Sequence, residues 1–154
     1  MNGVVLEAQA SLRDAAEADA VIVGSGRRTR EVVADAAIMD ELRFDPARQL
    51  IAAQCSGALV LAKLGLVRDA CTDLTTKPWV QEAGVEVLNQ PFYARGNVAT
   101  AGGCLASPYL AGWIIARTEG LEAATAALHY VAPVGEKEAY VANALKNITP
   151  YLPR

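Results

Sequence analysis

The sequence predicts an α/β fold, in which helices form a sandwich around a mainly parallel β-sheet. Residues 20–23 and 50–53 are continuous apolar runs, which are typical of buried parallel strands. Each run ends at a glycine-containing turn that leads into a helical stretch. Buried strands that alternate with helices indicate a parallel sheet with helices on both faces.

Short elements are expected around the first buried strand. Residues 4–6 should form a short strand, and Ser11 can cap a helical turn over residues 12–17. After the first buried strand, the pattern predicts a helix over residues 29–43, continuous or broken, that ends before Pro46.

The rest of the chain continues the alternation. A helix over residues 58–64 should end at Gly65, because glycine accepts the left-handed conformation of a helix C-cap. A short helix over residues 77–83 has Pro78 near its start and Gly84 at its end. The further expected elements are a mixed strand and loop segment at 69–76, strands at 85–88, 92–95 and 98–100, and helices at 109–118, 121–130 and 136–148.

Length and composition limit the classes of function. At 154 residues a single domain over residues 1–154 is expected. The net charge is -3 and no block of lysine or arginine occurs, which argues against nucleic-acid binding. The longest apolar stretch, residues 99–116, is interrupted by glycine and proline, so we expect neither a membrane span nor a signal peptide.

The cysteine and histidine content bears on cofactors and location. The three cysteines, an odd number without metal-ligand spacing, favour a reduced cytoplasmic protein. His129 is the single histidine, so a histidine-rich metal site is excluded. No metal, nucleotide or flavin signature is visible, and no cofactor is expected.

Residues 54–57, Gln-Cys-Ser-Gly, are the most informative motif. A buried strand, a tight turn with Cys55 at its apex and a helix have the arrangement of a nucleophile elbow. The start of the following helix favours a thiolate, because its unpaired amides and its dipole stabilise negative charge. The alternative is a buried structural cysteine, since free cysteine is among the most buried residue types.

A second loop is expected beside this turn. The loop at residues 24–26, Gly-Ser-Gly, and Cys55 both follow strands, and ligands bind at the carboxyl ends of parallel strands. Arg27, Arg28 and Arg30 come next. They are expected to form a solvated helix start, with anion binding as the alternative.

Four segments, in order, resemble the ThiJ/PfpI superfamily, whose members have a glutamine-amidotransferase-like fold. They are residues 19–26, 53–58, 100–103 and 130–133, and the resemblance covers about residues 17 to 148. It implies a flavodoxin-like three-layer sandwich, and the last segment is similar to the isonitrile-hydratase-like branch.

The resemblance also implies roles for residues. Cys55 corresponds to the nucleophile, and the amides of Gly26 and Ser56 correspond to an oxyanion hole. Where many relatives have a histidine, this chain has Asp73, or Lys77 in a second register. Asp73 is therefore the expected substitute for proton transfer, with a loop-capping role as its alternative.

The N-terminal part departs from the family pattern. Members of the family that this chain resembles begin with a strand-helix-strand unit that carries an acidic partner of the cysteine, and we expect this chain to lack that unit. Glu7 is the only early carboxylate near a strand and aligns poorly with the family acid. An exposed sheet edge, exposed apolar surface or a dimer contact is therefore expected near residues 3–23, and a homodimer is expected from the resemblance.

Two functions follow as hypotheses. The first is a cysteine-dependent hydratase, lyase or hydrolase that acts on a small molecule such as an isonitrile or an α-oxoaldehyde. The alternative is a non-catalytic domain that binds a ligand or senses oxidants through Cys55. Cys104 follows the late glycine loop and could pair with Cys55 in a disulfide, or could simply be a small packed residue.

Overall fold

A four-stranded sheet organises the fold of this computed structural model, which describes residues 3–153. The strands lie in the order β1 (Ala20–Val23), β2 (Leu50–Gln54), β6 (Val98–Ala101) and β5 (Phe92–Arg95). The first three are parallel to their neighbours, and β5 is antiparallel to β6. The mainly parallel sheet is thus confirmed. β3 (Asp69–Ala70) and β4 (Glu86–Val87) form a separate parallel pair.

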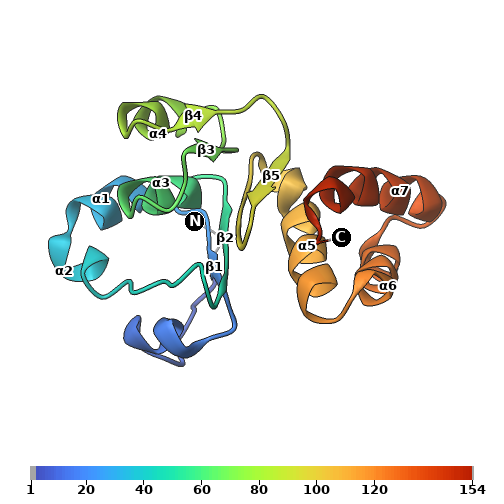
Figure 1. Cartoon of the computed structure of the whole chain (residues 1–154), viewed down its shortest axis with the longest axis horizontal. Coiled ribbons are helices and arrows are strands. Elements are labelled where there is room, and N and C mark those ends of the chain that lie inside the picture. The colour runs from blue at the N-terminus through green and yellow to red at the C-terminus, as the bar shows by residue number, and fades with distance from the viewer. Residues whose placement is uncertain (1–2, 154) are drawn as a thin grey trace.

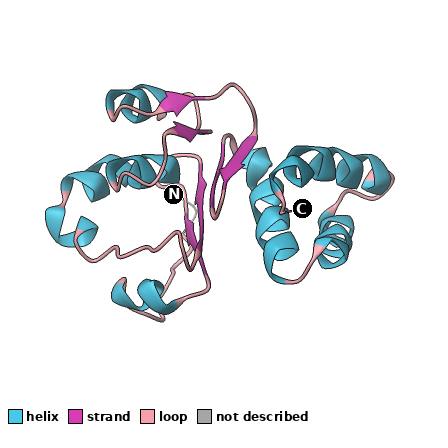
Figure 2. Cartoon of the chain, in the orientation of Figure 1, coloured by secondary structure: helices cyan, strands magenta, loops and turns pink. Residues whose placement is uncertain are grey.

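Helices cover both faces of the sheet. Figure 2 shows the strands at the centre, with helices on either side of them. α1 (Thr29–Ala34) and α3 (Gly57–Lys63) lie on one side in Figure 1, and α5 (Ser107–Thr118) lies on the other. α6 (Leu121–Val131) and α7 (Lys137–Ile148) pack on α5 and on each other. α4 (Lys77–Glu82) stands beside the β3–β4 pair.

Strand β2 lies at the centre because its side chains are apolar on both faces. Leu50 and Ala52 pack with Trp113 in the core beneath α5. Ile51 and Ala53 pack with the residues of α3 in a second core. The unbroken apolar run therefore reflects a strand that is buried on both sides.

Two expectations for the N-terminal part are wrong in detail. Residues 4–6 form no strand. The turn that follows is a 3-10 helix (Arg13–Glu17), and the Ser11 side chain accepts none of its amides, although the Ser11 carbonyl accepts the Asp14 N–H at 3.2 Å. Instead, the Asp14 carboxylate accepts hydrogen bonds from the backbone N–H and the hydroxyl of Ser11. The hydrogen bonds between Ser11 and Asp14 therefore stabilise this turn locally.

The helix expected over residues 29–43 is broken into α1 and α2 (Ala36–Met39). Asp35 leaves the helical conformation between them, with φ −90° and ψ 102°. Its carboxylate then accepts hydrogen bonds from the backbone N–H groups of Ala37 and Ile38. An N-cap inside the apolar pattern therefore ends one helix and starts the next.

The exposed apolar surface expected near residues 3–23 is present. β1 is an edge strand of the described sheet, and Ile22 on it is 56% exposed. Val5 and Leu6 are each 90% exposed. Within residues 3–153, no helix combines the length and the hydrophobicity that a bilayer-spanning segment needs.

We expect Trp113→Ala to destabilise the fold strongly. Its side chain is fully buried and packs against Phe92, with ring centroids 6.2 Å apart. Loss of such a side chain leaves a cavity and costs about 3–5 kcal/mol of unfolding free energy. Urea unfolding would measure this loss of unfolding free energy. Val134→Ala is the control, because Val134 is 94% exposed. A loss for Trp113→Ala no larger than that of the control would contradict this account of the core.

Candidate functional site

Cys55 lies in a strained turn between β2 and α3. Its φ is +49°, and it is the only non-glycine residue with a positive φ in the described chain. Its backbone N–H donates to the Ala101 carbonyl at 2.8 Å, which ties the turn to the end of β6. Left-handed backbone at a non-glycine residue persists only where the surroundings enforce it, and it is concentrated at functional sites. The turn has the geometry expected of a nucleophile elbow.

Gly57 lets this turn lie close to β1. A Cβ atom on Gly57 would come within 2.3 Å of the Val23 carbonyl oxygen. No side chain can be accommodated there without moving the backbone. The start of α3 and the end of β1 are therefore held together, which brings the loop at residues 24–26 beside Cys55.

The Ser56 hydroxyl fastens that loop. Its oxygen accepts a hydrogen bond from the Gly26 N–H at 3.0 Å. It also shares hydrogen bonds with the hydroxyls of Thr29 at 2.9 Å and Ser25 at 3.1 Å. The Gly26 amide, assigned to an oxyanion hole by the resemblance, is thus bonded to Ser56 in this conformation.

The Cys55 thiol is held by groups from two separate segments. Gln54 Nε2 lies 3.2 Å from Cys55 Sγ and donates to the Gly103 carbonyl at 2.8 Å. Burial raises the pKa of Cys55, although hydrogen bonds from Gln54 and the Gly103 backbone act to lower it. The thiolate expected from the helix N-terminus is therefore not favoured, and the neutral thiol is.

Gln54 is the contact that sequence reasoning missed. It is the last residue of β2, next to the cysteine in the sequence, and its side chain reaches Gly103. A polar residue that ends an otherwise apolar strand was the available signal. Its partner was not predictable, because Gly103 is brought there by the pairing of β2 with β6.

Asp73 is present at the site but is used for local structure. Its Oδ1 accepts hydrogen bonds from the backbone N–H groups of Thr75 at 3.0 Å and Thr76 at 2.9 Å. This is the loop-capping role that was the alternative. Lys77 lines a different hollow, and His129 belongs to α6, on the far side of α5 from the sheet.

A hollow of about 550 Å³ opens over Cys55. It brings together all four residues predicted for the site. Its described lining also includes Arg27, Arg30 and Trp79, but no histidine. The full lining is Ser25, Gly26, Arg27, Thr29, Arg30, Cys55, Ser56, Leu59, Asp73, Thr75, Thr76, Trp79 and Cys104.

The hollow has a cationic wall. The Arg30 guanidinium lies over the Trp79 ring, 4.2 Å from its centroid. Among the described residues, neither Arg27 nor Arg30 forms an ion pair, whereas Arg28 is paired with Glu31 at 2.6 Å. Asp73 is the only carboxylate in the lining, so the formal charge around the hollow is positive.

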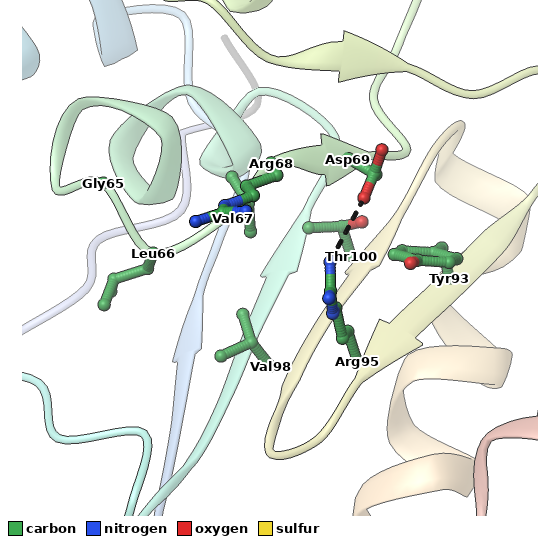
Figure 3. Close-up of a pocket in the computed structure, with 9 residues that line it drawn as sticks. All are labelled: Gly65, Leu66, Val67, Arg68, Asp69, Tyr93, Arg95, Val98 and Thr100. Carbon is green, nitrogen blue, oxygen red and sulfur yellow. Dashed lines mark ion pairs between the residues drawn. The ribbon is translucent and has the colours of Figure 1, made fainter.

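A smaller hollow of about 210 Å³ lies away from the cysteine, between β3 and the strands β5 and β6. Figure 3 shows Arg95 pointing towards Asp69, and the two form an ion pair at 3.9 Å. The lining of this smaller hollow contains none of the predicted site residues. Among residues 3–153, no cluster of three or more histidine, cysteine or acidic side chains could hold a metal ion.

Comparison with known proteins gives matches through structure alone. No protein-family model matches the chain, and no curated protein matches it in sequence. A DJ-1 superfamily protein from Salmonella typhimurium is similar with a TM-score of 0.63 and 25% identity, over 79% of this chain and 70% of its own.

Two further structures are similar at lower identity. DJ-1 of Schizosaccharomyces pombe matches with a TM-score of 0.51 and 19% identity, over 94% of this chain and 68% of its own. A ThiJ/PfpI family protein from Pseudomonas syringae matches with a TM-score of 0.51 and 18% identity, over 88% of this chain. The chain spans only 50% of the Pseudomonas protein. The chain therefore has the fold of the ThiJ/PfpI and DJ-1 superfamily proteins.

Proposed function

We propose that this protein is a ligand-binding domain that holds a small anionic molecule over the neutral Cys55 thiol. The observation that carries the proposal is the hollow itself. It combines a cysteine at a strained turn with a wall that carries Arg27 and Arg30. Its volume of about 550 Å³ suits a small organic molecule.

The ligand class follows from the charges. A guanidinium binds a carboxylate or a phosphate through two parallel hydrogen bonds. Arg30 is held against Trp79, which reduces the rotamer freedom that binding would otherwise remove. A small carboxylate or phosphate therefore fits the site better than a neutral or cationic molecule does.

The site is poorly equipped for proton transfer. General acid–base catalysis needs a titratable group within hydrogen-bond reach of the reacting atoms. Asp73 already accepts two backbone hydrogen bonds through Oδ1, and the described lining holds no histidine. Since burial also raises the pKa of Cys55, a nucleophilic thiolate is disfavoured at neutral pH.

A cysteine-dependent hydratase, lyase or hydrolase is the second candidate. The observation that favours it is the left-handed turn at Cys55, which is a strained conformation of the kind found at nucleophiles. In that reading Cys55 attacks an electrophilic carbon, and the Ser56 amide stabilises the developing charge. The Gly26 amide would first have to leave Ser56 Oγ.

We also propose that the protein is a homodimer that works in the cytoplasm. The support for a dimer is the exposed apolar surface of Ile22, Val5 and Leu6 on and before the edge strand β1. The support for the cytoplasm is that Cys55, Cys71 and Cys104 are all free thiols.

The pH dependence of Cys55 alkylation separates the two candidate functions. In a Cys104→Ser background, iodoacetamide labelling followed by mass mapping should give an apparent pKa above the free-thiol value of about 8.5. Gln54→Leu should raise it further, because it removes a hydrogen bond that lowers the pKa. The Cys55→Ser variant shows how much of the labelling comes from cysteines other than Cys55. An apparent pKa well below the free-thiol value would favour the enzyme.

Loss of the hollow's positive charge should weaken anion binding. Pyruvate and inorganic phosphate, titrated calorimetrically, are suitable probes. We expect Arg27→Ala and Arg30→Ala each to reduce affinity roughly tenfold, as loss of a charge-assisted hydrogen bond implies. Arg28→Ala is the matched control, because Arg28 is paired with Glu31 and lies outside the lining. Equal effects at Arg28 and Arg30, or no binding of either probe, would contradict the proposed ligand class.

A charge on the β1 edge should disrupt the dimer. Ile22→Lys places a cation on an exposed apolar edge, where it opposes pairing with a second copy. Light scattering after size-exclusion chromatography should show a dimer for the natural chain and a monomer for this variant. Leu74→Lys, at a site 89% exposed, is the control. A natural chain that is monomeric at all concentrations would refute the dimer.

A further inference from the structure

Two of the three cysteines meet at the same hollow. Cys55 and Cys104 both belong to its lining, although they are far apart in the sequence. Gln54 Nε2 contacts the Cys55 sulfur at 3.2 Å and the Gly103 carbonyl at 2.8 Å. That carbonyl is part of the peptide group that joins Gly103 to Cys104. One amide nitrogen therefore bridges the first cysteine to the backbone of the second.

The segment that carries Cys104 lies at the surface and follows a glycine with a positive φ. Gly103 has φ +86°, and a Cβ placed on it would contact nothing within 4 Å. Cys104 begins a single 3-10 turn (Cys104–Ala106), and Leu105 beside it is 93% exposed. Gly102, by contrast, is fixed, since a Cβ there would lie 2.6 Å from the Thr72 carbonyl oxygen. A change in the path of this segment must therefore occur after Gly102, at Gly103, whose carbonyl accepts hydrogen bonds from Gln54 Nε2 and from the Ala106 N–H.

We propose that Cys55 and Cys104 form an intramolecular disulfide when the protein meets a hydroperoxide. A disulfide needs Cα atoms roughly 4.4–6.8 Å apart. A rotation at Gly103, whose carbonyl shares the Gln54 amide with the Cys55 sulfur, would bring the two residues into that range. The inference does not depend on the ligand proposed above, because it concerns the two thiols alone.

The chemistry balances in two steps. Cys104 is the exposed thiol, so its sulfur attacks the peroxide: an S–O bond forms, the O–O bond breaks and an alcohol or water leaves. The Cys55 sulfur then attacks the sulfenic sulfur of Cys104. The S–S bond forms, the S–O bond breaks, and the hydroxyl leaves as water with the Cys55 thiol proton. Two thiols lose two electrons, and the hydroperoxide gains them.

The bond would change what the hollow can hold. Cys55 and Cys104 are both part of its lining, so a covalent link between them occupies space that is otherwise open. Cys71 cannot take part from its position in the core. It is fully buried, its backbone N–H donates to Thr100 Oγ1, and burial raises its pKa to about 12. Cys71 therefore serves as an internal reference for a thiol that peroxide should leave unchanged.

Mass spectrometry of the whole chain tests the proposal. Dilute protein is treated with hydrogen peroxide, denatured, alkylated without reductant and digested. The expected product is one linked peptide pair, Cys55 with Cys104, with Cys71 still alkylated. Cys71→Ser should form the same link at the same rate. Cys104→Ser should form no disulfide and should oxidise at Cys55 more slowly than the natural chain is crosslinked.

Several outcomes would overturn the proposal. They are oxygen adducts on Cys104 with Cys55 still alkylated, a link to Cys71, and a covalent dimer on a non-reducing gel at the lowest protein concentration. Calorimetric titration of the reduced protein with pyruvate tests the ligand proposal separately. A natural chain that binds pyruvate but forms no link would refute only the disulfide, and one that forms the link without binding would refute only the ligand.

Discussion

The left-handed turn at Cys55 is the constraint on which the rest of the site depends. Strand β2 is buried on both faces and ends at Gln54, and α3 begins at Gly57, so only Cys55 and Ser56 make the turn between them. The chain achieves this with φ +49° at Cys55 and a glycine at position 57, where any side chain would strike the Val23 carbonyl. The hydrogen bond from Cys55 N–H to Ala101 and the bonds of the Ser56 hydroxyl hold the strained conformation.

The same burial that stabilises the turn decides the state of the thiol. Cys55 is 2% exposed, so its thiolate would lack the hydration that stabilises a charge, and the hydrogen bonds from Gln54 and the Gly103 backbone only partly replace it. Neither Arg27 nor Arg30 is among the groups that shift the pKa of Cys55, so both charges remain available to the ligand that we propose. This is why we place a binding site ahead of a cysteine nucleophile as the proposed function.

The edge strand β1 connects the fold to assembly. It contributes the loop that Ser56 fastens, yet its own outer side carries the exposed Ile22. The loop at residues 24–26 continues directly from β1, so the exposed edge and the candidate site share one short segment of chain.

The sequence by itself determined the buried strands β1 and β2, the turn at Cys55 and the loop beside it. These depend on local pattern: an unbroken apolar run at residues 50–53, a cysteine at a tight turn, and glycines where the backbone must approach closely. The helix over residues 29–43 was expected to be continuous or broken, and the structure located the break at Asp35. Only the tertiary structure decided how the thiol ionises, that Gln54 reaches Gly103, and that Cys104 shares the hollow with Cys55. The physical reason is that burial and these contacts arise from the pairing of β2 with β6, two segments far apart in the chain, which no local pattern records.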